Sequence, residues 1–219
     1  MLDERMVDIK RELTEYSTLV QSMIERSIEG LLKKQRQGLL DIIEKDEPRA
    51  NEWEITLDEL CIYTIAQFAP RAKDLRTILM ALRINNDLER IGDHAVNIAE
   101  DALFLIERPE VKPLIDIPRM AEEAARMVRD SLLSFFQEDA ALAKSVCARD
   151  SIVDACEKQS LRELITYMSA DPTIVERALR LLDIARNLER IADLSTNVAE
   201  DVIFMVEGQL IKHHHVEHE

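Results

Sequence analysis

The sequence predicts an all-α fold made of two tandem, structurally similar antiparallel three-helix bundles. Three observations support this prediction. Only 4 of the 219 residues are glycine and 6 are proline, a composition that favours long helices and lacks the turn residues of a sheet protein. Apolar residues recur at steps of three and four, as on the buried face of a helix. The second half also repeats part of the first.

Three helices are expected in the first half. The first covers about residues 3–34, where one stripe of mostly apolar side chains follows a single face: Leu13, Tyr16, Val20, Met23, Ser27 and Leu31. After a joint or short helix around Gly38, a second helix is capped by Asp46 or Glu47, has Pro48 in its first turn and ends near residue 67. The third covers about residues 71–106.

A proline-rich linker divides the chain. Pro109, Pro113 and Pro118 lie close together, and such a segment cannot continue a helix. The predicted units are residues 1–107, a linker at 108–117, residues 118–208, and a tail at 209–219. Within the second half, helices are expected over about residues 116–137 and 139–168. A last helix is opened by Asp171 as its cap, with Pro172 at its first position, and ends before residue 208.

The third helices of the two halves are the most similar. Residues 82–107 read LRINNDLERIGDHAVNIAEDALFLIE and residues 182–207 read LDIARNLERIADLSTNVAEDVIFMVE, with 13 of 26 aligned positions identical. Six polar identities between residues 89 and 101 are not explained by a shared core: Glu89/Glu189, Arg90/Arg190, Asp93/Asp193, Asn97/Asn197, Glu100/Glu200 and Asp101/Asp201. Their repetition suggests a shared role.

Helical geometry places three acids and one amide of this set on one face. Glu89, Asp93, Asn97 and Glu100 lie within roughly 80° of one another. Glu89 and Asp93 are four residues apart, where two like charges destabilise a helix by roughly 0.2–0.5 kcal/mol. Because this clash occurs in both halves, we expect a cation between the carboxylates.

The second helix of each half supplies an opposite wall. Its polar residues are Glu47, Asn51, Glu54 and Asp58 in the first half, and Asp150, Asp154 and Glu157 in the second. If these walls face the third helices, each half offers an all-oxygen site suited to a hard cation such as Mg, Ca, Mn or Fe. The predicted ligands are Glu89, Asp93, Glu189, Asp193, Asn97, Asn197, Glu100, Glu200, Glu54, Asp150, Asp154 and Glu157. The alternative is a solvated acidic face with salt bridges inside each helix.

Charge and composition argue against several classes of protein. The net charge is −15, with 43 acidic and 28 basic residues, and such a surface repels nucleic acid. The chain contains no apolar run long enough to cross a membrane and no apolar secretory signal near its start, which predicts a cytoplasmic location. Its 3 cysteines are expected to be free, packed thiols. No enzyme motif is found, so catalysis is not expected.

The segments NNDLERIGDHAVNIAED and RNLERIADLSTNVAED, with APRAKDLRTIL before the first, resemble the PhoU family of phosphate-transport accessory proteins, and the similarity covers essentially the whole chain. The resemblance implies twin three-helix bundles, usually dimeric. It also implies negative regulation of phosphate uptake through contacts with the ATPase subunit of the phosphate ABC transporter and with a sensor histidine kinase. The chain would reach the membrane only through these partners.

Some members of the family bind multinuclear iron or zinc clusters on Glu/Asp-x-x-x-Asp motifs. These motifs correspond here to Glu89 with Asp93 and to Glu189 with Asp193, so clusters of Fe, Zn, Mn or Mg are expected as cofactors. Pro48 departs from the family pattern and weakens any ligand role of its neighbours. Two other functions stay open, a metal-storage or redox protein and a purely structural scaffold.

Two histidine features are given little functional weight. His94 is expected to point toward solvent, away from the acidic face. The His-rich tail, IKHHHVEHE, is expected to be disordered.

Overall fold

The computed structural model describes residues 1–207, and every regular element in this range is helical. The long helices are α1 (Leu2–Lys33), α3 (Glu47–Phe68), α4 (Ala72–Ile106), α5 (Asp116–Gln137), α6 (Ala140–Ala170) and α7 (Val175–Glu207). Shorter elements are α2 (Arg36–Asp41), a π-helical turn (Ile42–Asp46) and a 3₁₀ turn (Pro172–Ile174). None of the helices in the described range has the length and apolar character needed to cross a membrane.

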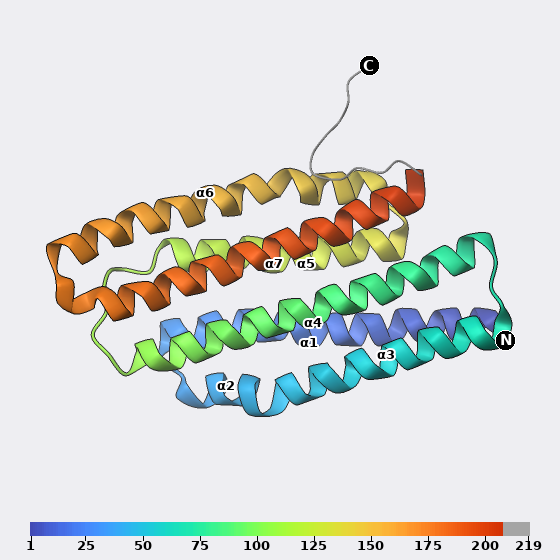
Figure 1. Cartoon of the computed structure of the whole chain (residues 1–219), viewed down its shortest axis with the longest axis horizontal. Helices are drawn as coiled ribbons and strands as arrows, with labels where there is room; N and C mark the ends of the chain where they lie inside the picture. The colour runs from blue at the N-terminus through green and yellow to red at the C-terminus, as the bar shows by residue number, and fades with distance from the viewer. Residues whose placement is uncertain (208–219) are drawn as a thin grey trace, which may run out of the picture.

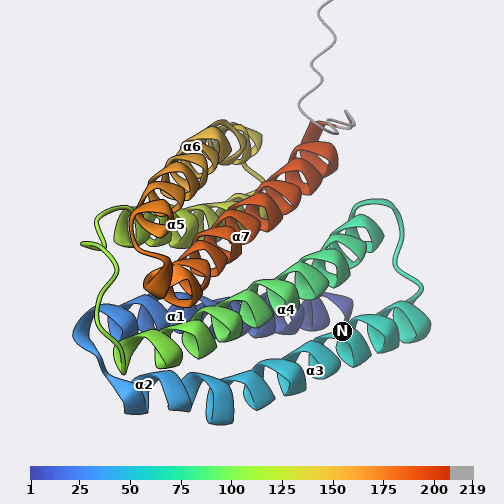
Figure 2. The same cartoon turned by 60° about the vertical axis from the view of Figure 1, so that its left-hand side comes forward.

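The helices form the two bundles that the sequence predicts (Figure 1). In the first bundle α1, α3 and α4 pack against one another, and in the second bundle α5, α6 and α7 do the same. The bundles meet along two antiparallel helix pairs, α4 with α7 and α1 with α5 (Figure 2). Buried side chains from both bundles form one continuous apolar cluster. The two units are therefore joined by a shared core as well as by the linker.

The helix ends agree with most of the sequence signals, with one correction. Pro48 lies in the first turn of α3 as predicted. Asp139 and Asp171 cap the helical segments that follow them, each by accepting hydrogen bonds from backbone N–H groups. The predicted cap at Asp46 is wrong, because its side chain makes no capping bond. Its buried carboxylate instead forms an ion pair with Arg26 of α1, and a π-helical turn joins α2 directly to α3.

The short helix α2 is held by a close contact with α1. Leu39 of α2 is fully buried, and a Cβ atom added to Gly30 of α1 would lie 2.5 Å from its Cδ2 atom. Only glycine leaves room for this side chain, because any other residue would overlap it. The segment around Gly38, which the sequence left as a joint or a short helix, is thus a helix packed on the first bundle.

Two ion pairs cross the seam between α4 and α7. Arg83 Nη1 lies 2.7 Å from Asp201 Oδ1, and Arg180 Nη1 lies 2.7 Å from Asp101 Oδ1. Asp101 and Asp201 occupy equivalent positions of the repeat, whereas their arginine partners do not, because the counterparts of Arg83 and Arg180 are Asp183 and Met80. This seam explains why both aspartates are shared by the two halves.

The expectation that His94 points to solvent is wrong. His94 is half-buried in the seam, and its Nδ1 atom lies 2.8 Å from Oδ1 of Asn187 on α7. Burial lowers the pKa of His94, and the hydrogen bond to Asn187 opposes that shift. The error arose because a single-helix projection does not include the second bundle, which covers this face of α4.

Asp87 occupies an unfavourable position in the same seam. Burial raises the pKa of Asp87 to about 6, and Asp201 and Asp193 add to that shift, while Arg90 and Arg83 oppose it. The equivalent residue of the second half is the uncharged Asn187. The Asp87 carboxylate therefore costs stability near neutral pH that an amide would not.

We predict that Asp87→Asn stabilises the protein in a pH-dependent way. Folding raises the pKa of the Asp87 carboxyl group from 3.8 to about 6. Such a group lowers the free energy of unfolding as pH rises through this window, and the full loss of stability is present above pH 6. Urea unfolding at pH 8 should show a gain of up to about 3 kcal/mol. The gain should be smaller at pH 5 and absent below pH 3.8.

The matched control is Asp183→Asn, which removes the same charge from a half-exposed side chain beside Arg186 on α7. This variant should change the free energy of unfolding by less than about 0.5 kcal/mol. A loss of stability in Asp87→Asn at pH 8, or a gain that does not depend on pH, would contradict this description of the seam.

Candidate functional site

The first acid row consists of Glu54 on α3 and of Glu89 and Asp93 on α4. Burial raises the pKa of Glu89, and the charges of Asp93 and Glu54 raise it further. A hydrogen bond between the Glu89 and Asp93 carboxyl groups contributes to the same shift. Arg90 is the cation that opposes these effects, yet its side chain is largely exposed. The predicted crowding of like charges on this face of α4 is therefore present.

The packing of α3 explains why an acid from the second helix joins this row. Ala50, Leu57 and Cys61 of α3 are buried in the core, so Glu54 lies on the flank of the same helix. Asn85 of α4 ties the two helices together, because its Nδ2 atom donates to the Glu54 carbonyl at 2.8 Å and to a carboxylate oxygen one turn further along α3 at 2.9 Å. Of the expected opposite wall of the first bundle, Glu54 and Asp58 therefore lie beside α4.

The second acid row consists of Asp150, Asp154 and Glu157 on α6 with Glu189 and Asp193 on α7. Burial again raises the pKa of Glu189, followed by the charges of Asp154, Asp193, Asp150 and Glu157 in that order. Five of the six acids that the sequence assigned to the second bundle, all except Glu200, thus form one group in which the other four act on Glu189.

The two rows offer oxygen atoms from carboxylates on adjacent helices, the donors preferred by hard cations. Within residues 1–207, however, no three His, Cys, Asp or Glu side chains are arranged so that they could hold one metal ion. The rows thus have the right donor chemistry, and their side chains would have to turn toward a common point to bind a cation.

The other predicted ligands lie nearer the seam. Asn97 and Glu100 are exposed on α4, and Asn197 and Glu200 line a cavity of about 530 Å³ between the bundles. Glu200 also lies near Cys147 of α6, where burial, Glu200 and a neighbouring aspartate raise the pKa of the thiol to about 11. Of these four residues, the structure places Asn197 and Glu200 at the seam.

The cysteines of the described range are free, as expected. Cys61 is buried, and Cys147 and Cys156 are half-buried. Burial, together with the charge of Asp58, raises the pKa of Cys61 to about 12, which leaves an unreactive thiol. The His-rich tail that the sequence predicted to be disordered lies outside the described residues.

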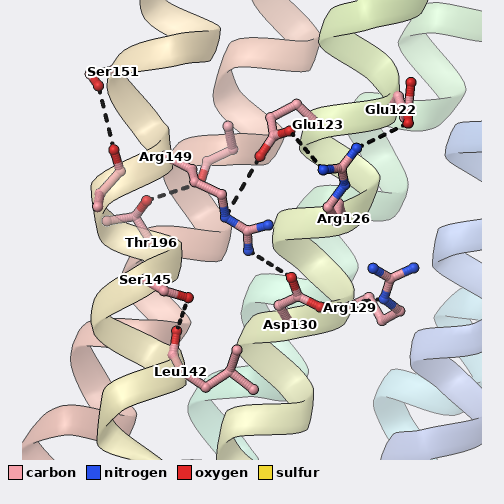
Figure 3. Close-up of polar contacts among 12 residues, drawn as sticks. Glu122, Glu123, Arg126, Arg129, Asp130, Leu142, Ser145, Arg149, Ser151 and Thr196 are labelled. Carbon is pink, nitrogen blue, oxygen red and sulfur yellow. Dashed lines mark hydrogen bonds and ion pairs between the residues drawn. The ribbon is translucent and has the colours of Figure 1, made fainter.

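The two bundles differ in the ion pair that joins their first and second helices. In the second bundle Arg149 of α6 reaches Asp130 of α5, with Nη2 2.8 Å from Oδ2, and lies 3.6 Å from Glu123 (Figure 3). In the first bundle the acid is Asp46, in the π-helical turn that leads into α3, and the arginine is Arg26 on the first helix. The same interface is therefore closed by pairs of opposite polarity.

Sequence reasoning missed two polar groups beside the first row. Tyr16 belongs to the apolar stripe of α1 and is fully buried. Burial raises the pKa of its hydroxyl group, and the charges of three acids, Glu54, Glu89 and Asp93, raise it further. Asn85 is 1% exposed but reads as a polar residue on a helix face. Neither position carried a signal, because a stripe pattern does not show which neighbours a side chain meets.

Comparison with known proteins places both bundles in one family. The PhoU domain matches this chain twice, over residues 13–102 and 117–202. The phosphate-specific transport system accessory protein PhoU homolog of Aquifex aeolicus is 40% identical over 215 residues, covering 98% of this chain and 97% of the relative. PhoU homolog 2 of Thermotoga maritima is 33% identical over 217 residues, covering 99% and 92%.

Solved structures agree with this assignment. The crystal structure of PhoU from Pseudomonas aeruginosa matches with a TM-score of 0.91 and 33% identity, covering 95% of this chain and all of that one (100%). The phosphate transport system regulatory protein PhoU from Streptococcus pneumoniae matches with a TM-score of 0.88 at 24% identity, which supports the fold. With two domain matches, one in each bundle, and relatives aligned over nearly their full length, this chain belongs to the PhoU family.

Proposed function

We propose that this protein is a non-catalytic accessory protein of phosphate transport that restrains phosphate uptake and phosphate-responsive signalling by binding other proteins. Its partners would be the ATPase subunit of the phosphate transporter and a sensor histidine kinase, and it would act as a cytoplasmic homodimer that reaches the membrane only through them. The observation that carries the proposal is the family match to both bundles, together with relatives named as phosphate-specific transport system accessory proteins.

The outer face of α3 supports a role in protein binding. Ile55, Ile62 and Tyr63 are 59%, 60% and 54% exposed, respectively. Ile55 and Ile62 are two helical turns apart and share a face, and the exposed acids Glu52 and Glu59 accompany them. Large apolar side chains with a polar rim are typical of a docking surface. We infer that this α3 strip binds an apolar partner surface with a basic rim.

We expect deletion of the gene in its host to cause constitutive alkaline phosphatase or toxic phosphate accumulation, and re-expression to reverse it. A variant with both Ile55→Lys and Ile62→Lys should fail to restore regulation, because two cations would face the basic rim. It should keep the melting temperature of the unmodified protein, since both side chains are exposed.

Leu133→Lys is the control, because Leu133 is an exposed aliphatic side chain on α5. This variant should restore regulation fully. A deletion strain with normal phosphate responses would refute the adaptor function. Full rescue by the α3 double variant would refute only the assignment of the docking strip.

We also propose that the acid rows bind hard cations. The crowded carboxylates Glu89 and Asp93, and likewise Glu189 and Asp193, are stabilised by a positive charge that the neighbouring side chains do not fully supply. Buried polar atoms beside the first row, which have unused hydrogen-bonding capacity, fit such a ligand. Mg, Mn, Fe or Zn ions, singly or as clusters, would stiffen each bundle or tune a docking face.

The cation proposal predicts opposite effects of one double variant in two conditions. Without metal, Glu89→Gln with Asp93→Asn should raise the melting temperature, because it removes a like-charge pair. Added Mn²⁺ should stabilise the unmodified protein by about 2.7 kcal/mol for each row that is filled at 100 times its Kd. The double variant should lose the part of this stabilisation that comes from Mn²⁺ bound at the first row.

The matched comparison is the equivalent change in the second bundle, Glu189→Gln with Asp193→Asn. This variant should lose the stabilisation that comes from Mn²⁺ bound at the second row. A double variant that melts no lower with Mn²⁺ than the unmodified protein would support the scaffold with solvated acidic faces. A metal-storage or redox function would instead require release or turnover of the metal. Stoichiometric metal without oxidase activity would favour the adaptor.

A further inference from the structure

The two acid rows are flanked by different side chains, although the bundles are copies of one another. Helices α1 and α5 both end in a residue with left-handed backbone geometry, Lys34 with φ 53° and Glu138 with φ 54°. Counting back from these ends aligns Tyr16 with Met120. The same register aligns Ser27 with Ser131, which are both buried and both donate to the carbonyl three residues earlier.

Tyr16 carries a hydroxyl group that the fold leaves unused. The side chain is fully buried, and its ring stacks on Trp53 with the centroids 6.3 Å apart. Its Oη atom has no hydrogen-bond partner within residues 1–207. The group lies in the electrostatic field of Glu54, Glu89 and Asp93, and burial and these acids raise the pKa of the phenol. It is therefore a buried, protonated donor close enough to the first acid row for the charges of all three acids to act on it.

Asn85 provides an unused acceptor on the next helix. Its Nδ2 atom makes both hydrogen bonds available to it, to the Glu54 carbonyl and to the carboxylate of Asp58. Its buried Oδ1 atom has no partner in the described part of the chain. The equivalent position of the second half is Ala185, whose side chain has no polar atom.

Leaving a buried donor or acceptor unpaired costs roughly 1–3 kcal/mol. Replacement by apolar residues of similar size removes this cost, and the second bundle has apolar residues at both positions. A hydrated cation supplies both kinds of partner, because its waters accept from a phenol through their lone pairs and donate to an amide oxygen. Outer hydrogen bonds of this kind commonly change metal affinity by roughly 10–100-fold.

We propose that Tyr16 and Asn85 are positioning residues that hold a hydrated divalent cation at the first acid row, so that the first bundle binds the cation more tightly than the second. This inference rests on the cation binding proposed above and adds that the two rows are unequal. The first row would respond to low cation concentrations, and the second, flanked by Met120 and Ala185, would fill only at higher ones.

The test isolates each row in the full-length protein and uses Mn²⁺ as the probe, with free Mn²⁺ counted by electron paramagnetic resonance. Glu189→Gln with Asp193→Asn leaves the first row intact, and Glu89→Gln with Asp93→Asn leaves the second. The first row should bind with a Kd at least about 10-fold lower than the second. Tyr16→Phe, which keeps the stacked ring, should weaken the first row by about 10-fold or more and leave the second unchanged.

Asn85→Ala, which installs the residue of the second half, should also weaken the first row alone. Metal-free melting separates positioning from structure, because Tyr16→Phe should melt no lower than the unmodified protein. Equal Kd values for the two rows, or a first row unaffected by Tyr16→Phe, would overturn this inference and leave the cation proposal standing. If Mn²⁺ binds neither row, both fail.

Discussion

The structure depends on the requirement that α4 and α7 pack on two sides at once. Each is the third helix of its own bundle and also half of the seam between the bundles. Two apolar contacts use most of the surface of a helix, so the acidic residues are confined to the flank that faces α3 or α6. That confinement brings Glu89 next to Asp93, and Glu189 next to Asp193, and holds an acid of the neighbouring helix against them.

This arrangement gives the repeated polar residues two different roles. Asp101 and Asp201 receive arginines across the seam at 2.7 Å and hold the bundles together. Ion pairs with partly exposed arginines contribute little to the free energy of unfolding. These two pairs therefore serve mainly to fix how the bundles are placed relative to each other. In the acid rows, burial and the like charges of neighbouring carboxylates raise the pKa of Glu89 and of Glu189, and Asp87 adds a third place where negative charge is poorly balanced. The charge that the fold leaves unbalanced is what makes a cation or a basic partner surface a reasonable ligand.

Most of the fold could be predicted from the sequence because its signals are local. The apolar spacing located the long helices, and proline located the linker and the start of α3. The 13 identities between the third helices indicated two equivalent units. The placement of acids on adjacent helices of one bundle was also foreseen, since it follows from helical geometry.

The sequence could not predict any contact that involves the other bundle. His94 was expected at the surface, and the contact of Asp101 with Arg180 was not foreseen. Tyr16 and Asn85 were missed because burial among acids is a property of three helices together.

The measurement that tests the central claim most directly is anomalous X-ray scattering from crystals grown with Mn²⁺. If carboxylate crowding on α4 and α7 is balanced by a cation, the strongest anomalous peak will lie between α3 and α4, within bonding distance of Glu89 and Asp93. A weaker peak will lie between α6 and α7 beside Glu189. A crystal at saturating Mn²⁺ with no peak at either row, or with its strongest peak in the seam cavity, would contradict the account.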